Sequence, residues 1–153
     1  MTTDTGSRRN TELVRSAFEL LNAHDVRACA ELLAEDFIIN LAGMPYQQHG
    51  RQAWQTNVEM MLRAFPDLHA EILDVFGEED RVAVRLMFRG THRGEFQGVA
   101  PTGREVRYGS IELYRVTDGR LAEEWIASDI ETLMHQIIAP PPEGSPAGGN
   151  TRS

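Results

Sequence analysis

The sequence predicts an α+β fold, in which helices pack on one side of a curved, mostly antiparallel sheet that encloses a pocket. Apolar residues recur with helical spacing in the first half of the chain and again near its end, whereas residues 68–127 alternate with a period of two. Strands that follow one another after a run of helices indicate an α+β fold. With 153 residues, the chain has room for one domain with a substantial core.

Three helices are predicted before the run of strands and one after it. Asn10 or Thr11 is the expected N-cap of the first. Asp25 can cap the second, which would extend through Leu33 and carry Val26, Cys29, Leu32 and Leu33 on one buried face. The third runs from Arg51 to Phe65, where a proline stops it. The last is an amphipathic helix over residues 130–138.

These helices bound a single domain over residues 10–138. Residues 1–9 are expected to form a flexible N-terminal tail. Residues 139–153 are too rich in proline, glycine and polar residues to be buried, and we expect them to be disordered.

The strands are expected at residues 37–42, 68–76, 81–92, 105–116 and 120–127, and the last four should form a meander. Thr117, Asp118 and Gly119 are typical of a tight hairpin connection. In the strand over 105–116, alternation places polar side chains on one face and apolar ones on the other. The apolar pair, Ile111 and Leu113, is the natural packing face. The polar face carries Tyr108, Ser110, Glu112 and Tyr114.

Four glycines within residues 89–108 raise the possibility of a phosphate-binding loop. Such a loop requires a helix directly after it, to supply free N–H groups and the helix dipole. Here a strand follows instead, and Gly103 precedes Arg104 rather than lysine. The stretch is therefore interpreted as the connection between two strands, with a turn at 101–103. Gly90 and Gly94 would relieve crowding where the chain bends.

Composition excludes several classes of partner and cofactor. The formal net charge of −8 argues against nucleic-acid binding, and no apolar run is long enough to span a membrane. The polar N-terminus lacks the apolar core of a signal peptide, which favours a cytoplasmic location. Cys29, the single cysteine, cannot form an intramolecular disulfide, and no metal-ligand spacing is present. We expect neither a metal nor an organic cofactor.

Three motifs resemble the SnoaL-like polyketide cyclase family, within the nuclear transport factor 2-like superfamily. They are FPDLH at 65–69, PTGR at 101–104 and YRVTDGRLAEEWIASD at 114–129, and the resemblance covers about residues 10–138. It implies a cone-shaped α+β barrel, usually dimeric, with a deep apolar pocket. Characterised members cyclise polyketide esters by intramolecular aldol chemistry without a cofactor, and relatives of the same fold open epoxides, isomerise ketosteroids or hydroxylate polyketides.

The resulting hypothesis is a cofactor-independent enzyme that acts on a hydrophobic polyketide by carboxylate acid/base catalysis, and a polyketide ester cyclase is its leading form. An epoxide hydrolase or epoxide-opening cyclase and a cofactor-free hydroxylase are alternatives of the same fold. A non-catalytic small-molecule-binding protein is the alternative from another class. A homodimer or higher homo-oligomer is expected from the resemblance.

Four carboxylates are candidate catalytic groups, and three of them have a simpler explanation. Glu112, at a position where the resemblance places a histidine of the anthracycline cyclases, could be a solvated strand residue. Asp129, in the family's acidic ending, could favour the helix dipole beside a capping box formed by Ser128 and Glu131. Glu124 matches an acidic residue directly before the family's tryptophan. A shift of one residue in the strand register decides whether Glu124 or Asp129 faces inward. The fourth is Asp67.

Asp67 could share a strand face with His69 as an acid/base pair, or could be a turn residue after a proline. Aromatic, histidine and hydroxyl side chains could bind the substrate, although helical and strand spacing makes most of the aromatic ones core residues. The candidates are Tyr46, Trp54, His69, Phe88, His92, Tyr108, Ser110 and Trp125.

Overall fold

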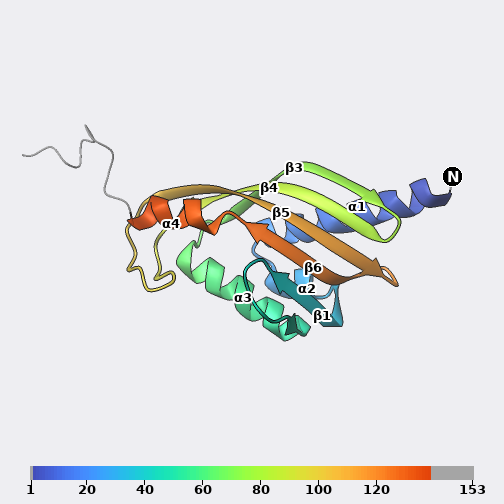
Figure 1. Ribbon diagram of the computed structural model, residues 1–153, viewed down its shortest axis with the longest axis horizontal. Coiled ribbons are helices and arrows are strands. Elements are labelled where there is room, and N and C mark those ends of the chain that lie inside the picture. Colours follow the sequence, from blue (N-terminus) through green and yellow to red (C-terminus); the bar gives the residue numbers. More distant parts are fainter. Residues whose placement is uncertain (1, 139–153) are drawn as a thin grey trace, which may run out of the picture.

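The computed structural model describes residues 2–138 and consists there of four helices and six strands (Figure 1). The predicted tail over 139–153 lies outside the described residues. The elements in chain order are α1 (Thr2–Asn22), α2 (Val26–Ala30), β1 (Leu33–Leu41), β2 (Gln48–His49), α3 (Arg51–Ala64), β3 (His69–Glu78), β4 (Arg81–Thr91), β5 (Glu105–Thr117), β6 (Arg120–Ser128) and α4 (Ile130–Ile138).

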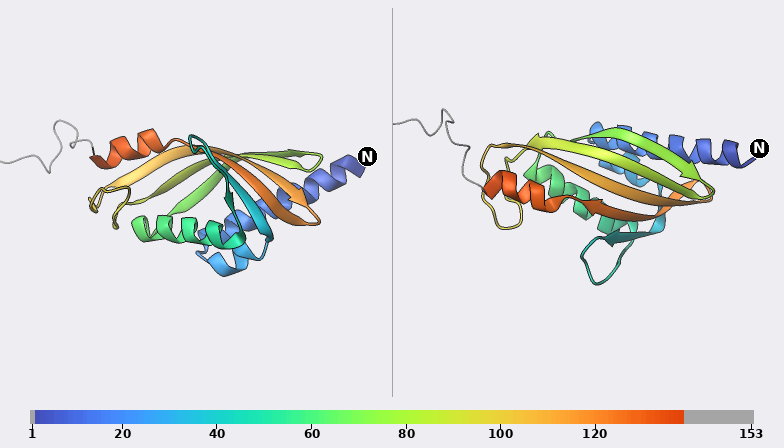
Figure 2. Two further views of the ribbon diagram at one scale, coloured as in Figure 1. Left: turned by 60° about the horizontal axis from the view of Figure 1, so that its bottom comes forward. Right: turned by 45° about the horizontal axis from the view of Figure 1, so that its top comes forward.

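The strands form one mixed sheet in the order β2-β1-β6-β5-β4-β3. The predicted meander of β3 to β6 is confirmed, and β1 adds to β6 in parallel. The sheet curves over α1, α2 and α3, whereas α4 continues from β6 at one end of it (Figure 2). Because β2 and β3 remain separate edges, the cone is open and not a closed barrel. The α+β fold is thus confirmed.

The inner face of the sheet combines the apolar side of β4 with the polar side of β5. Val84 pairs with Glu112 and Leu86 with Ser110, so these side chains point to the same face. All four are buried, whereas Ile111 is 61% exposed on the outer face. The expectation that Ile111 belongs to the packing face of β5 is therefore wrong. The register with β4, and not polarity, decides which side of β5 is buried.

The first two helices differ from their predicted bounds. Helix α1 begins at Thr2, so residues 2–9, predicted as a tail, are helical. Asn10 is not a cap; its side-chain amide donates to the carbonyl of Glu79, 3.1 Å away, and ties the helix to the end of β3. Asp25 caps α2 as predicted, accepting from the Ala28 N–H at 3.1 Å. Helix α2 ends early because Leu33 already belongs to β1 and pairs with Leu121.

The glycine stretch wraps against the C-terminal end of α3. The backbone N–H groups of Arg93 and Gly94 donate to the carbonyl of Ala64, at 2.9 and 3.0 Å. A Cβ on Gly94 would lie 2.2 Å from the carbonyl oxygen of Arg63. Glycine is therefore required there by close backbone approach. Gly103 has a φ of +74°, as the predicted turn demands.

Replacing Gly94 with alanine should destabilise the fold, because the added methyl group meets helix backbone that cannot rotate away. We expect the free energy of unfolding to fall by about 2–3 kcal/mol, measured by urea denaturation. Gly109→Ala is the matched control, since the nearest atom to its added Cβ is 3.8 Å away. Equal stability of the two variants would contradict this account of Gly94.

Candidate active site

A cluster of polar side chains lies on the inner face of the sheet, across β5 and β6. We call it the polar cluster; it consists of Ser110, Glu112, Tyr114, Glu124 and Ser128. Ser110 pairs with Ser128 and Tyr114 pairs with Glu124, which places the side chains of both strands on one face. Glu112 is 5% exposed and Glu124 is 3% exposed. Two carboxyl groups are thus withdrawn from water together.

Hydrogen bonds satisfy both oxygens of the Glu112 carboxyl group. The Tyr114 hydroxyl donates to Oε1 at 2.6 Å, and the Ser110 hydroxyl donates to Oε2 at 3.1 Å. Ser110 in turn contacts the Ser128 hydroxyl at 2.8 Å. A buried carboxylate is costly unless such donors surround it. The cluster therefore provides an environment in which Glu112 can hold a charge.

The pKa values of both carboxyl groups are raised, that of Glu124 more strongly than that of Glu112. Burial raises the pKa of Glu112, and the hydrogen bonds from Tyr114 and Ser110 oppose that rise. Burial and then the charge of Glu112 raise the pKa of Glu124 well above its ordinary value. Burial also raises the pKa of the Tyr114 hydroxyl. Environments that separate two carboxyl groups in this way prepare one as an acid and the other as a base.

A β-bulge in the hairpin between β5 and β6 determines which glutamate faces inward. Val116 pairs with Leu121, but Arg115 pairs with Glu123, so Ala122 is an extra residue in β6. Beyond the bulge, Tyr114 faces Glu124. Without it, Tyr114 would face Glu123 and Glu124 would point outward. The bulge therefore places Glu124 on the inner face, which strand alternation alone could not decide.

Asp129 lies at the surface and caps α4. Its carboxylate accepts from the backbone N–H of Thr132 at 3.1 Å and from the Thr132 hydroxyl at 2.7 Å. These bonds lower the pKa of Asp129. The capping contact is therefore made by Asp129 and not by the predicted box of Ser128 and Glu131. Of the two open candidates, Glu124 faces the polar cluster.

Asp67 and His69 also lie apart from the polar cluster. Asp67 accepts from the N–H and the hydroxyl of Thr91, both at 2.7 Å. Burial opposes its ionisation, but these bonds outweigh it and lower the pKa of Asp67. His69 pairs with Arg89, while the neighbouring pair of Ala70 and Phe88 is buried, so His69 lies on the outer face. The Asp67 carboxylate is thus bound to Thr91 at the end of β4.

The predicted substrate-binding residues divide into three groups. Trp54, Phe88, Tyr108 and Ser110 are buried. Phe88 and Tyr108 stack with ring centroids 5.3 Å apart, beside the polar cluster along β4 and β5. Tyr46, on the loop between β1 and β2, is exposed. Trp125 lies beneath the Arg81 guanidinium on the outer face, 5.1 Å from it.

His92 forms a separate buried site beyond the end of β4. Its Nδ1 lies 3.0 Å from the Thr102 hydroxyl and 3.2 Å from the Thr102 N–H, which donates to it. The ring packs against Phe65 at 5.6 Å. Its Nε2 has no hydrogen-bond partner among the described residues. His92 thus fastens the turn at 101–103 to the end of β4.

The sequence placed Tyr114 beside Glu112 on one strand face but did not indicate Ser128 as a member of the polar cluster, nor Cys29 as a neighbour of it. Cys29 is buried as predicted, and its thiol donates to the Ala17 carbonyl at 3.3 Å. Burial and then the charge of Glu124 raise the pKa of that thiol to about 12. The available signal was one serine on each strand of the β5–β6 hairpin, Ser110 and Ser128. Counting back from the turn would have paired Ser110 with Ser128 only if the bulge had been known.

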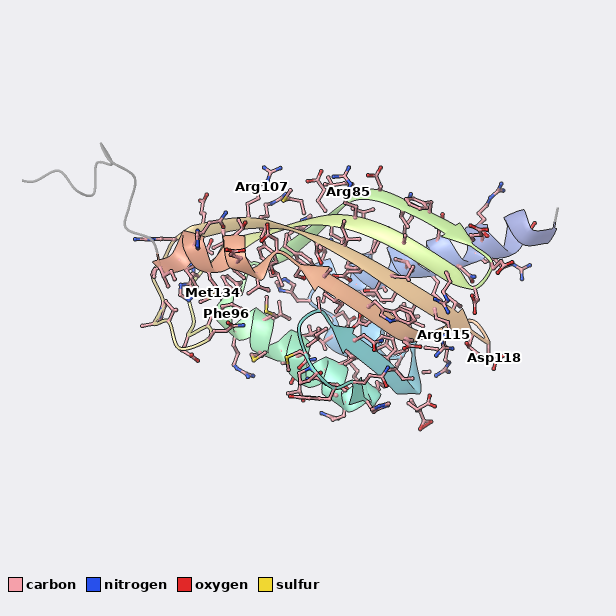
Figure 3. The ribbon with its side chains drawn as sticks, viewed as in Figure 1. Arg85, Phe96, Arg107, Arg115, Asp118 and Met134 are labelled. Carbon is pink, nitrogen blue, oxygen red and sulfur yellow. The ribbon has the colours of Figure 1, made fainter. Side chains whose placement is uncertain are left out.

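Apolar side chains of α3 and α4 pack against the core and stay partly exposed. They are Val58 and Met61 of α3, with Ile130 and Met134 of α4. In Figure 3, Met134 and Phe96 lie on the helix side of the sheet, between α4 and α3, whereas Arg85 and Arg107 project from its outer side.

Neither a metal site nor a helix that could span a membrane occurs within the described residues 2–138. No group of three or more histidine, cysteine, aspartate or glutamate side chains in this part of the chain could hold a metal ion. None of its helices is both long and apolar enough to cross a membrane.

An open α+β cone of this kind is the fold of SnoaL-like proteins. A candidate SnoaL-like polyketide cyclase from Jannaschia shares this fold, with a TM-score of 0.80 and 24% identity over 88% of this chain and 95% of its own. The chain belongs to the SnoaL-like polyketide cyclase family, whose profile matches residues 11–137. Family membership classes it with the cyclase-like enzymes and confirms the resemblance.

Three individual proteins show the range of similarity. Aklanonic acid methyl ester cyclase AcmA from Streptomyces galilaeus is 32% identical over 96 residues, which span 61% of this chain and 66% of that relative. AclR, a candidate hydroxylase from Streptomyces galilaeus, has a TM-score of 0.80 and 27% identity, over 90% of this chain and 87% of its own. IdmH, a candidate polyketide cyclase from Streptomyces antibioticus, has a TM-score of 0.73 and 34% identity, over 83% of this chain and 96% of its own.

Replacing Glu124 with glutamine should make stability less sensitive to pH. In the wild type the unfolded chain releases its proton near the ordinary pKa of 4.5, while the folded protein retains it to higher pH. The free energy of unfolding therefore falls as pH rises through this interval. Glu124→Gln removes this loss, so the variant should match the wild type at low pH and exceed it increasingly at higher pH.

Urea denaturation at a series of pH values measures this difference. Glu123→Gln is the matched control on the neighbouring position, because Glu123 pairs with Arg115 at 3.1 Å and lies on the outer face. A variant-to-wild-type difference for Glu124→Gln that does not change with pH would show that Glu124 is not held protonated by the fold.

Proposed function

We propose that this protein is a cofactor-independent polyketide cyclase that closes a ring by intramolecular aldol chemistry. The observation that carries the proposal is the buried pair of carboxyl groups, Glu112 and Glu124, with the Tyr114 hydroxyl between them. The similarity to an aklanonic acid methyl ester cyclase supports the same reaction class. We propose a hydrophobic polyketide ester as its substrate.

Glu112 is the base and Glu124 the acid in this proposal. Glu112, whose ionised form receives two hydrogen bonds, takes a proton from a carbon next to a carbonyl group. The resulting enolate carbon attacks a second carbonyl carbon of the same molecule and forms the new carbon–carbon bond. The oxygen of that second carbonyl takes the proton from Glu124. The product is an isomer of the substrate.

Tyr108 and its aromatic neighbours are proposed to bind the substrate. No hydrogen bond of the Tyr108 hydroxyl occurs among the described residues, so it can donate to the enolate oxygen. The ring pair of Tyr108 and Phe88 offers a flat apolar wall, and Trp54 of α3 lies across the core. Such a site suits a planar, fused-ring molecule with ketone groups along one edge.

The test of this function is turnover of aklanonic acid methyl ester, the compound in the relative's name. We expect a product of unchanged mass, detected by liquid chromatography and mass spectrometry. Glu112→Gln and Glu124→Gln should each lower kcat by about a hundredfold or more, the usual effect of losing an acid or base. Asp129→Asn is the matched control and should remain active, because Asp129 caps α4 at the surface. Full activity in both glutamate variants would refute the assignment.

Hydroxylation is the second candidate, favoured by the similarity to AclR over most of both chains. It would proceed on the same inner face: Glu112 removes a proton from carbon, the carbanion adds to molecular oxygen as the second substrate, and the peroxide formed takes the proton back as a hydroperoxide. The turnover assay separates the two reactions. A product heavier by two oxygen atoms, formed only in air and converted to the alcohol by an added thiol reductant, identifies an oxygen-dependent reaction.

We also propose that the protein is a homodimer built through the outer face of the sheet. An apolar row crosses four strands there, from Phe76 through Ala83 and Leu113 to Trp125. Exposed Ile111 stands between two hollows of about 470 and 270 Å³ and lines both. A two-fold axis would let each Ile111 enter a hollow of the other copy, so the surface is complementary to itself.

Replacing Ile111 with arginine should therefore convert a dimer into a folded monomer. Light scattering after size exclusion should give twice the chain mass of 17.2 kDa for the wild type and one chain mass for the variant. Met60→Arg, on the exposed side of α3, is the control and should leave the dimer intact. A monomeric wild type, or a dimeric Ile111→Arg, would contradict this interface.

A further inference from the structure

The polar cluster contains a continuous chain of hydroxyl groups that ends near solvent. Ser128 is the last residue of β6 and is half-buried, whereas Ser110 and Glu112 are buried. The Ser128 and Ser110 hydroxyl oxygens are 2.8 Å apart, and the Ser110 hydroxyl lies 3.1 Å from Glu112 Oε2. On the other side, Tyr114 is 2.6 Å from Glu112 Oε1. No link in this chain exceeds hydrogen-bond length.

The direction of these hydrogen bonds follows from counting donors. A serine hydroxyl has one proton to donate and can accept as well. Ser110 donates to Glu112, so the contact between the two serines must be donated by Ser128. Every hydroxyl in the chain then points toward the ionised carboxylate. If Glu112 is protonated at Oε2 instead, both serine hydroxyls can turn and donate outward.

We propose that Ser110 and Ser128 form a proton relay that connects the buried Glu112 carboxyl group with solvent at the end of β6. Water gives a proton to the Ser128 oxygen, Ser128 passes its own proton to Ser110, and Ser110 passes its own to Glu112 Oε2. Each serine gains one proton and releases one, so one proton is transferred in total. The reverse sequence returns a proton from Glu112 to water.

The role of such a relay rests on the proposed function. The aldol reaction starts from an ionised Glu112 and a protonated Glu124, and neither carboxyl group is exposed enough to exchange freely with water. The relay lets Glu112 reach its ionised state by releasing a proton through Ser110 and Ser128. After turnover, Tyr114, which contacts both carboxyl groups, can pass the proton from Glu112 back to Glu124. The serines are relay residues and need not touch the substrate.

The other titratable groups around Glu112 offer no comparable route. The buried groups that influence it or its partners are Tyr108, Tyr114, Glu124 and Cys29. Burial raises the pKa of the Cys29 thiol to about 12, and the thiol hydrogen bonds with Ala17 instead of the cluster. Among these described groups, the serine pair alone leads from Glu112 to a half-exposed residue.

Time-resolved infrared spectroscopy of the full-length protein tests the relay without any substrate. The carbonyl stretch of the protonated Glu112 carboxyl group, assigned by its absence in Glu112→Gln and its presence in Glu124→Gln, should rise quickly after a drop in pH. Ser128→Ala should slow that rise about tenfold or more, because protonation must then wait for local opening of the fold. Ser128→Thr, which keeps the hydroxyl, should restore the rate.

Ser110→Ala provides a second break in the chain and should slow protonation equally. Ser16→Ala, an exposed serine of α1, is the control and should have no effect. Unchanged rates in both Ser128→Ala and Ser110→Ala, or a Glu112 band that never titrates before unfolding, would overturn the relay. Rapid, serine-dependent protonation combined with no loss of turnover in Glu112→Gln would keep the relay and reject the proposed function.

Discussion

The β-bulge at Ala122 is the constraint on which the interior of this protein depends. A hairpin with a short turn has one register, and a single extra residue in β6 reverses the face of every side chain that follows it. Glu124 and Ser128 face inward for this reason, opposite Tyr114 and Ser110. Burying a carboxyl group beside Glu112 is unfavourable by itself. The surrounding hydroxyl groups and the long pairing of β5 with β4 compensate for it.

The distribution of polarity over the sheet departs from the usual arrangement, in which polar residues face water. In β5 the acid and hydroxyl groups are inside and Ile111 is outside. Such an inversion lowers stability in a single copy, since it buries carboxyl groups and exposes apolar ones. Proteins retain inverted polarity where the interior performs chemistry and the exterior contacts another surface. The proposed reaction on the inner face and the proposed dimer on the outer face would account for the two sides of β5.

Much of the fold could be predicted from the sequence, and the exceptions have identifiable causes. The meander, the cap at Asp25 and the inward face of β4 follow from local patterns. The early end of α2 does not, because pairing of β1 with β6 overrides helical spacing. For the site, Glu112 and Glu124 were among the candidates, but choosing Glu124 over Asp129 required the bulge. No residue type near Ala122 predicts a bulge there, so choosing Glu124 over Asp129 required the observed register of β5 and β6.

The segment after β4 is attached to the rest of the protein at both of its ends. Arg93 and Gly94 donate backbone hydrogen bonds to Ala64, and His92 contacts Thr102 and Gly103. Between these anchors, Phe96 is buried and packs against Phe65 at the end of α3. A change at Phe96 would therefore reshape the apolar interior beside α3, whereas the polar cluster, which is built on β5 and β6, would stay in place.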